Sequence, residues 1–295
     1  MTGVGGYAVL LLLIATIPAG CDRATNPAPG KTEPDQHTLR VITLSPNLAE
    51  LVYAVGAGDL LVGVSAYTDY PPEAAALPVV GDAFNLDQEQ LALLEPGLLL
   101  AWDTGTPAHV VDELRRRGYR VEIVTTTHLA DIGQALLKIG ALTGRTSRAN
   151  VAAGAFQEGL DELRVRYSGA PSISVFYQVD ARPLYTINGD HFVSEIIAIC
   201  GGVNIFADLE GLAPLVSVEA VLARDPEVML AGSDAGIAAF DAWTRWTDLA
   251  ANRYGNRFII PADQIGRATP RLLQATQVVC DALQTGRENR ETYNK

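Results

Sequence analysis

The sequence is poor in the residues that catalysis and metal binding use. It has 295 residues but only 4 histidines and 3 cysteines. The cysteines form no CxxC pair and the histidines form neither HExxH nor HxH, so a zinc or redox site has little support; the histidines are His37, His109, His128 and His191. No glycine-rich phosphate loop or GxGxxG motif occurs. Gly63–Tyr67 comes near to the nucleophile elbow of hydrolases, but it ends in tyrosine where that motif needs glycine. Together these absences argue against an enzyme.

Positive charge and long apolar runs are scarce as well. The chain has 22 Lys and Arg against 34 Asp and Glu, a net charge of −12. Nucleic-acid binders need a basic face, so that class of partner is excluded. The apolar run Tyr7–Ile17 is shorter than the roughly 20 residues that cross a bilayer. Any contact with a membrane must therefore be made by other means.

The first residues have the pattern of an export signal. The apolar run is followed by Pro18-Ala-Gly and then Cys21, which is typical of a lipoprotein signal with lipid on Cys21. No Lys or Arg precedes the run, and Pro18 stands where leucine is usual, so an ordinary cleaved signal remains an alternative. Asp22 resembles the residue that retains lipoproteins on the inner membrane of Gram-negative cells. We expect a signal peptide over 1–21, a flexible tether over 22–38, and a periplasmic protein anchored through Cys21.

One segment of the sequence occurs twice without a gap. Residues 87–101 recur as residues 217–231, with Glu219 following Glu89 by 219 − 89 = 130 positions. Each copy starts with a helix cap, places its glutamate in the first helical turn, and ends the helix at a proline before an apolar strand. A looser echo relates Glu50–Gly56 to Glu195–Gly201. The repetition predicts two similar lobes, although such units can also look alike by chance.

Short apolar runs alternate with helical patterns along the chain, which predicts parallel sheets covered by helices. We expect strands at 40–44, 61–64, 98–102, 121–124, 173–179 and 257–260, and helices from Ser45-Pro46, at 108–117, 192–199 and 270–283. Residues 147–167 form a proline-free helical segment of roughly 30 Å, long enough to join two lobes as a strut. The predicted fold is α/β, with two lobes of mainly parallel sheets joined by a single long rigid helix. Its parts are an N-terminal lobe at 39–145, a linker helix at 146–169, a C-terminal lobe at 170–287 and a tail at 288–295.

Aromatic and polar residues follow several of these strands. They include Tyr67, Trp102, Tyr185, Asp263 and Arg267. In open α/β sheets ligands bind beyond the carboxyl ends of the strands. Each residue alone could serve a turn or the packing. Together they predict a cleft between the lobes that takes a large, flat or amphipathic ligand.

Four stretches carry a resemblance to a known family: residues 40–47, 63–72, 199–206 and 267–271. They resemble the periplasmic cobalamin-binding proteins of ABC importers, within the helical-backbone (class III) substrate-binding protein family. The similarity covers about residues 39–283. It implies a corrinoid held between the lobes as transported ligand, no cofactor and no enzymatic activity. A ferric siderophore or haem on the same fold is the alternative, and the scarcity of basic residues near the loops, only Arg182 and Arg267, argues against catecholate siderophores.

The resemblance also implies roles for individual residues. Tyr67 and the loop of Asp263, Gln264, Ile265, Gly266 and Arg267 match ligand contacts, and Trp102 matches an aromatic of the pocket. Tyr185 joins this set. Some family members carry tryptophan at Ala213 or within Asp82–Phe84, so Phe84 is a candidate substitute.

Two further pairs of residues match the family. Glu89 and Glu219, one in each lobe, match glutamates that dock onto arginines of the permease dimer. Cys200 and Cys280 match the family disulfide, whereas from the residues alone they could equally be two buried thiols. The expected partners are thus cobalamin and the importer permease, with a membrane reached only through the lipid on Cys21.

Overall fold

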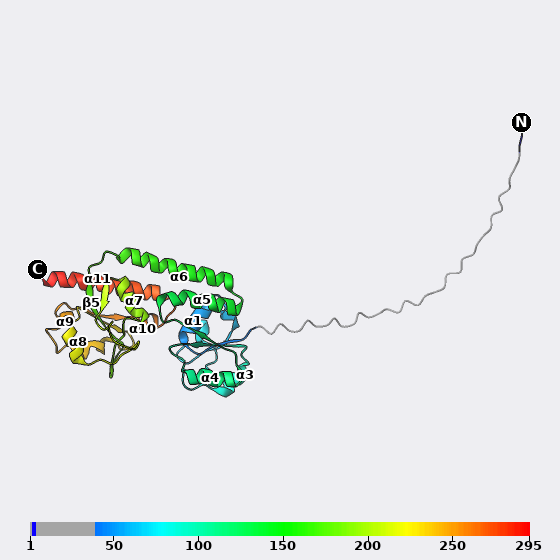
Figure 1. Ribbon diagram of the computed structural model, residues 1–295, viewed down its shortest axis with the longest axis horizontal. Coiled ribbons are helices and arrows are strands. Elements are labelled where there is room, and N and C mark those ends of the chain that lie inside the picture. The colour runs from blue at the N-terminus through cyan, green and yellow to red at the C-terminus, as the bar shows by residue number, and fades with distance from the viewer. Residues whose placement is uncertain (1, 4–38) are drawn as a thin grey trace. The chain divides into compact units, whose positions relative to one another are not determined.

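The computed structural model describes residues 2–3 and 39–295 of the chain (Figure 1). The expected lipidation site Cys21, most of the expected signal peptide and the tether at 22–38 lie outside the described residues. Residues 38–295 form one compact unit. This unit contains both predicted lobes and the cleft between them.

The N-terminal lobe is a four-stranded parallel sheet with helices on both faces. Its strands lie in the order β2-β1-β3-β4. The elements are β1 (Val41–Thr43), α1 (Pro46–Ala54), η1 (Gly58–Leu60), β2 (Leu61–Gly63), α2 (Pro72–Ala75), α3 (Gln88–Leu94), β3 (Leu98–Trp102), α4 (Ala108–Arg116), β4 (Val121–Val124) and α5 (Leu129–Thr143).

The alternation of side chains along β3 explains this layering. Leu98 and Leu100 belong to the cluster that includes α1 and α5, whereas Leu99 and Ala101 belong to the cluster that includes α3 and α4. Successive side chains of a strand point to opposite faces, so an uninterrupted apolar run can be buried on both sides only in a covered parallel sheet. The sequence prediction of this strand is confirmed to the residue.

The C-terminal lobe repeats the same topology. Its parallel sheet has the order β10-β9-β5-β8. Read from its other edge, as β8-β5-β9-β10, this order matches β2-β1-β3-β4 of the N-terminal lobe strand for strand. The elements are β5 (Ile173–Gln178), the hairpin β6 (Asp180–Ala181) and β7 (Leu184–Tyr185), α7 (Phe192–Ile199), β8 (Gly202–Asn204), α8 (Val218–Arg224), β9 (Val228–Gly232), η2 (Ile237–Trp243), α9 (Ala250–Arg253), β10 (Arg257–Ile260), α10 (Ala262–Ile265) and α11 (Leu272–Tyr293).

The repeated sequence segment forms the same structure twice. Helix α3 and strand β3 of one lobe correspond to α8 and β9 of the other, each element displaced by 130 residues (218 − 88 = 130 and 228 − 98 = 130). Asp87 caps the first helix by accepting from the backbone N–H of Gln90, and Ser217 caps the second by accepting from that of Ala220. The prediction of two similar α/β lobes is confirmed.

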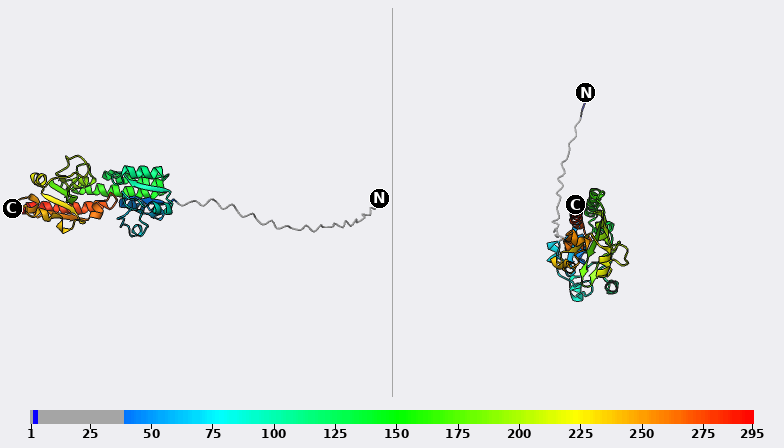
Figure 2. Two further views of the ribbon diagram at one scale, coloured as in Figure 1. Left: turned by 90° about the horizontal axis from the view of Figure 1, so that it is seen from below. Right: turned by 90° about the vertical axis from the view of Figure 1, so that its left-hand side faces the viewer.

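A single 22-residue helix, α6 (Thr146–Tyr167), connects the two sheets. It packs along α5 in the N-terminal lobe and along α11 and α7 in the C-terminal lobe, as Figures 1 and 2 show. Gly159 belongs to this packing, because a Cβ there would overlap the side chain of Leu273 on α11. A continuous helix of this length resists bending more than an extended segment does.

The last helix is longer than the sequence predicts. We expected its end near Leu283, but α11 continues to Tyr293 and includes residues assigned to the tail. Arg287 is buried on this extension and donates to the backbone carbonyls of Pro171 and Cys200. These contacts to distant parts of the lobe hold the additional turns. The expected disulfide is present, joining Cys200 at the end of α7 to Cys280 within α11.

Candidate ligand-binding site

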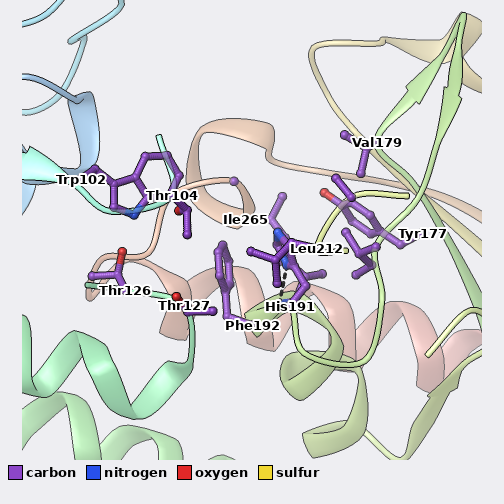
Figure 3. A pocket seen from close by; sticks show the side chains of 14 residues that line it. Trp102, Thr104, Thr126, Thr127, Tyr177, Val179, His191, Phe192, Leu212 and Ile265 are labelled. Atoms are coloured by element: carbon purple, nitrogen blue, oxygen red, sulfur yellow. Dashed lines mark hydrogen bonds between the residues drawn. The ribbon is translucent and has the colours of Figure 1, made fainter. Parts of the chain in front are cut away.

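A cavity of about 300 Å³ lies between the two lobes (Figure 3). The N-terminal lobe contributes Trp102 at the end of β3, Thr104 after it, and Thr126 and Thr127 after β4. The C-terminal lobe contributes the other lining residues: Tyr177, Val179, Ile187, His191, Phe192, Val193, Leu212, Ala213, Ile265 and Gly266. The cavity is therefore at the carboxyl ends of β3 and β4 and of β5 and β10, where ligands of open α/β folds bind.

Aromatic rings form much of the wall. Phe192 stands in the centre of the view in Figure 3, with Trp102 of the other lobe on one side and Tyr177 on the other. His191 lies beside Phe192, with ring centroids 4.5 Å apart. Such rings offer large apolar faces to a flat ligand.

The cavity has no charged side chain among its described lining residues. Burial lowers the pKa of His191 to about 4, so this ring is neutral at pH 7. Its Nδ1 accepts a hydrogen bond from the backbone N–H of Val193 at 3.1 Å, which leaves the ring hydrogen on Nε2. Burial also raises the pKa of the Tyr177 phenol, which is therefore uncharged. The site is suited to a neutral ligand and offers no cation to an anionic one.

Two polar atoms of the N-terminal wall have no protein partner. The indole Nε1 of Trp102 and the hydroxyl of Thr126 are buried and make no hydrogen bond with the described residues. Figure 3 shows them turned toward one another at the edge of the cavity. Buried polar groups are nearly always hydrogen-bonded, so an unpaired donor beside a hydroxyl marks a place where a ligand or water completes the bonding. A carboxamide, with one acceptor oxygen and an N–H donor, matches this pair of groups.

Of the predicted ligand residues, the structure brings three to the cavity: Trp102, Ile265 and Gly266. Asp263 and Gln264 lie on the short helix α10 beside it, and the Asp263 carboxylate pairs with Arg271. Arg267 is directed to the other lobe. Its Nη1 donates to Glu50 at 3.0 Å and to Asp69 at 2.5 Å.

The remaining three lie outside the cavity. Tyr67 is 84% exposed and has a left-handed φ of 65°, and its backbone carbonyl accepts from Arg267 at 3.2 Å. Phe84 is 69% exposed, in a turn where the Asp82 carboxylate accepts from the backbone N–H of Phe84. We expected Tyr185 in a loop after a strand, but it lies in the hairpin strand β7 and pairs with Asp180. These three can contact only a ligand that extends beyond the cavity.

The two expected docking glutamates occupy equivalent exposed positions. Glu89 is the second residue of α3 and Glu219 the second residue of α8. Hydrogen bonds from its own backbone N–H and from Ser217 lower the pKa of Glu219, so its carboxylate stays charged. Exposed carboxylates at helix starts are available for arginines of a partner.

Several residues that line the cavity were not predicted from the sequence. Thr126 and Thr127 lie just after the end of β4, and Trp102 lies at the end of β3. The rule that ligands bind at the carboxyl ends of strands, which selected Trp102, would also have selected these two threonines. Tyr177 lies inside β5, where an aromatic residue looks like ordinary core. His191 belongs to no histidine motif in the sequence, and only the fold places it in the cavity.

Comparison with known proteins agrees with this architecture. Residues 41–264 match the family described as periplasmic binding protein. The vitamin B12-binding protein of Vibrio cholerae serotype O1 is 36% identical over 245 residues, which cover 83% of this chain and 88% of the relative. The structure of the periplasmic vitamin B12 binding protein BtuF of Vibrio cholerae has a TM-score of 0.77 at 34% identity, covering 84% of this chain and 97% of that one.

A haem-binding protein shares the fold at lower identity. The periplasmic heme-binding protein RhuT from Roseiflexus sp. RS-1 has a TM-score of 0.75 but 22% identity, covering 84% of this chain and 99% of that one. This likeness concerns the fold alone.

The chain belongs to the periplasmic binding protein family. Its relatives are binding proteins and not enzymes, in agreement with the missing catalytic motifs. Two other absences hold for the described residues: no group of histidines, cysteines and carboxylates could hold a metal ion, and no helix is both long and apolar enough to cross a membrane.

Proposed function

We propose that this protein captures cobalamin between its two lobes and delivers it to an ABC importer. The observation that supports this ligand is the chemistry of the cavity, which has aromatic walls and, among the described residues that line it, no charged side chain. A corrin ring bears uncharged carboxamide arms, and the unpaired Trp102 indole and Thr126 hydroxyl suit such arms. Vitamin B12 is also what the two Vibrio cholerae proteins named above bind.

Haem fits this cavity less well. Haem carries two carboxylates, and burying an unpaired carboxylate is costly unless a cation meets it. The described residues that line the cavity include no lysine or arginine. The nearby Arg267 is already held by Glu50 and Asp69. A ferric catecholate siderophore, which is strongly anionic, meets the same obstacle.

The test is isothermal titration of the purified protein with cyanocobalamin, haem and a ferric catecholate siderophore in parallel. We expect saturable one-to-one binding of cyanocobalamin alone. Saturable binding of an iron chelate, with no heat on titration with cyanocobalamin, would refute cobalamin as the ligand and leave the assignment of the fold unaffected.

Delivery requires a docking surface and a place in the cell. We propose that Glu89 and Glu219 meet arginines on the two halves of a permease dimer, one glutamate on each half.

We also propose that lipid on Cys21 anchors the protein on the periplasmic side of the inner membrane. Incorporation of labelled palmitate into the wild type but not into Cys21→Ser would support the anchor, and equal absence of label from both would refute it.

A further inference from the structure

Two contacts, each centred on a glutamate, join the lobes, and the twofold repetition of the fold relates them. The first centres on Glu50 in α1 of the N-terminal lobe. Its carboxylate accepts from Arg267 at 3.0 Å, from Arg271 at 3.1 Å and from the Thr269 hydroxyl at 2.9 Å, all three from the C-terminal lobe. We call this the Glu50 contact.

The second centres on Glu195 in α7 of the C-terminal lobe. Its carboxylate lies 2.9 Å from Nδ1 of His128 and 3.4 Å from the backbone N–H nitrogen of Leu129, both in the N-terminal lobe. We call this the Glu195 contact. Glu50 and Glu195 are the first residues of the looser echo in the sequence, and each lies five positions before the C-cap of its helix (55 − 50 and 200 − 195).

The partners correspond as well as the glutamates do. Glu50 reaches the segment after β10, and Glu195 reaches the segment after β4. Strands β10 and β4 occupy the same place in the two sheets. Each lobe therefore has one helix glutamate that contacts the other lobe. In both cases the contacted segment follows the edge strand at the same place in the sheet, β10 for Glu50 and β4 for Glu195.

The two contacts stand beside the cavity lining. Ile265 and Gly266 line the cavity directly before Arg267, and Thr126 and Thr127 line it directly before His128. Because α6 is the helix that links the two sheets in the described part of the chain, contacts across the interface limit how far the lobes can move about it. We propose that Glu50 and Glu195 are positioning residues, which set the separation of the cavity walls and thereby the retention of the ligand.

The two contacts differ in strength. The Glu50 side chain is 3% exposed and the two arginines 16% each, whereas the side chains of Glu195 and His128 are 32% and 52% exposed. Arg271 also stacks on Tyr70 of the opposite lobe, with its guanidinium 4.2 Å from the ring centroid. Exposed pairs contribute little and are screened by salt, whereas removing one partner of a buried pair leaves the other charge poorly compensated. The Glu50 contact is thus the main restraint and the Glu195 contact the weaker one.

A distance measurement between the lobes tests this without any ligand. Spin labels at Leu93→Cys on α3 and Ala223→Cys on α8 occupy equivalent exposed positions of the two copies (223 − 93 = 130), in the full chain with Cys21→Ser. We expect Glu50→Gln to widen and shift the distance distribution measured by double electron–electron resonance, and Glu195→Gln to widen it less. Glu113→Gln is the matched control, because Glu113 pairs with Arg117 within one helix. If Glu50→Gln does not fold, Thr269→Val removes one hydrogen bond to the same carboxylate.

A kinetic measurement tests the consequence for the ligand and rests on the proposed function. The dissociation rate of cyanocobalamin should rise about tenfold or more in Glu50→Gln, less in Glu195→Gln, and not at all in Glu113→Gln. If the wild type binds no cobalamin, the proposed function fails while the label distances still decide this inference. If the wild type binds cobalamin but the distance distribution is unchanged in both Glu50→Gln and Glu195→Gln, this inference is refuted and the function stands.

Discussion

Glu95 and Asp225 end their helices in the same left-handed conformation, with φ of 42° and 40° respectively. They are separated by 225 − 95 = 130 residues, and each precedes a proline, which disfavours a helical conformation in the residue before it. Left-handed φ is unusual for residues other than glycine. The repetition of the two lobes thus extends to a strained backbone position.

The environments of the two residues differ, which leads to a first prediction. Glu95 is exposed, whereas the Asp225 carboxylate accepts from the backbone N–H of Ala250 at 2.8 Å. We expect Glu95→Gly to raise the free energy of unfolding by about 1 kcal/mol, because it removes left-handed strain and a negative charge at a helix C-terminus. Asp225→Gly should not stabilise, because it also removes the hydrogen bond. Denaturant unfolding of both variants decides this, and equal shifts would contradict it.

A second prediction concerns the docking glutamates. The double variant Glu89→Ala/Glu219→Ala should bind cobalamin with wild-type affinity, because both side chains are exposed and outside the cavity. It should fail to stimulate transport or ATP hydrolysis by the importer in vesicles. Each single variant should keep part of the activity, since one contact remains. Glu158→Ala, an exposed glutamate on the linker helix, is the control. Full transport by the double variant would disprove the docking role.

A third prediction separates ligand binding from stability at Thr126. The hydroxyl is buried and makes no hydrogen bond with the described residues, so replacing it with the isosteric valine should leave the free energy of unfolding unchanged or higher. In the proposed function this hydroxyl bonds to a carboxamide of the ligand, so the same change should weaken cobalamin binding by about 1 kcal/mol, roughly fivefold. Thr143→Val is a useful contrast, because that buried hydroxyl donates to the Ile139 carbonyl at 2.7 Å and its loss should destabilise. Unchanged affinity in Thr126→Val would remove this residue from the ligand site.

A fourth prediction concerns acid and His191. Burial lowers its pKa from 6.5 to about 4, so the unfolded chain takes up a proton at a higher pH than the folded protein. Stability from this group is fully present above pH 6.5 and is lost as the pH falls toward 4. Between pH 7 and pH 4.5 the wild type should therefore lose more unfolding free energy than His191→Gln, which does not titrate. Urea unfolding at the two pH values measures this.

The exposed His109 supplies the control for that experiment. His109→Gln should follow the wild type, because the neutral buried ring at His191 is still present. Identical losses in the wild type and His191→Gln would show that this ring contributes nothing to the acid sensitivity.

Much of the fold could be predicted because its signals are local. The strands at β3, β4 and β10 and the helix at α7 were predicted to the residue, since apolar runs, caps and turn residues act within a few positions of one another. The end of α11 was missed because a distant contact holds it, the insertion of Arg287 against Pro171 and Cys200. A local pattern contains no information about such a partner.

The site was predicted less completely for the same reason. Trp102 follows a strand and could be recognised, whereas Tyr177 looked like core and His191 like an isolated histidine. The contact of Arg267 with a ligand stays a prediction, and the structure shows this side chain against Glu50, 217 residues away in the chain. Whether an arginine meets a ligand or another lobe depends on the packing of the two sheets.

The sequence by itself determined the two-lobed α/β architecture and its internal repetition, because alternating apolar periods and repeated caps specify helices and strands locally. It also excluded catalytic and phosphate-binding motifs. Only the tertiary structure decided which side chains line the cavity, that none of those described is charged, and that Glu50 and Glu195 reach across to the opposite lobes. Those properties arise where segments far apart in the chain meet, and burial and pairing at such places are set by the packed fold.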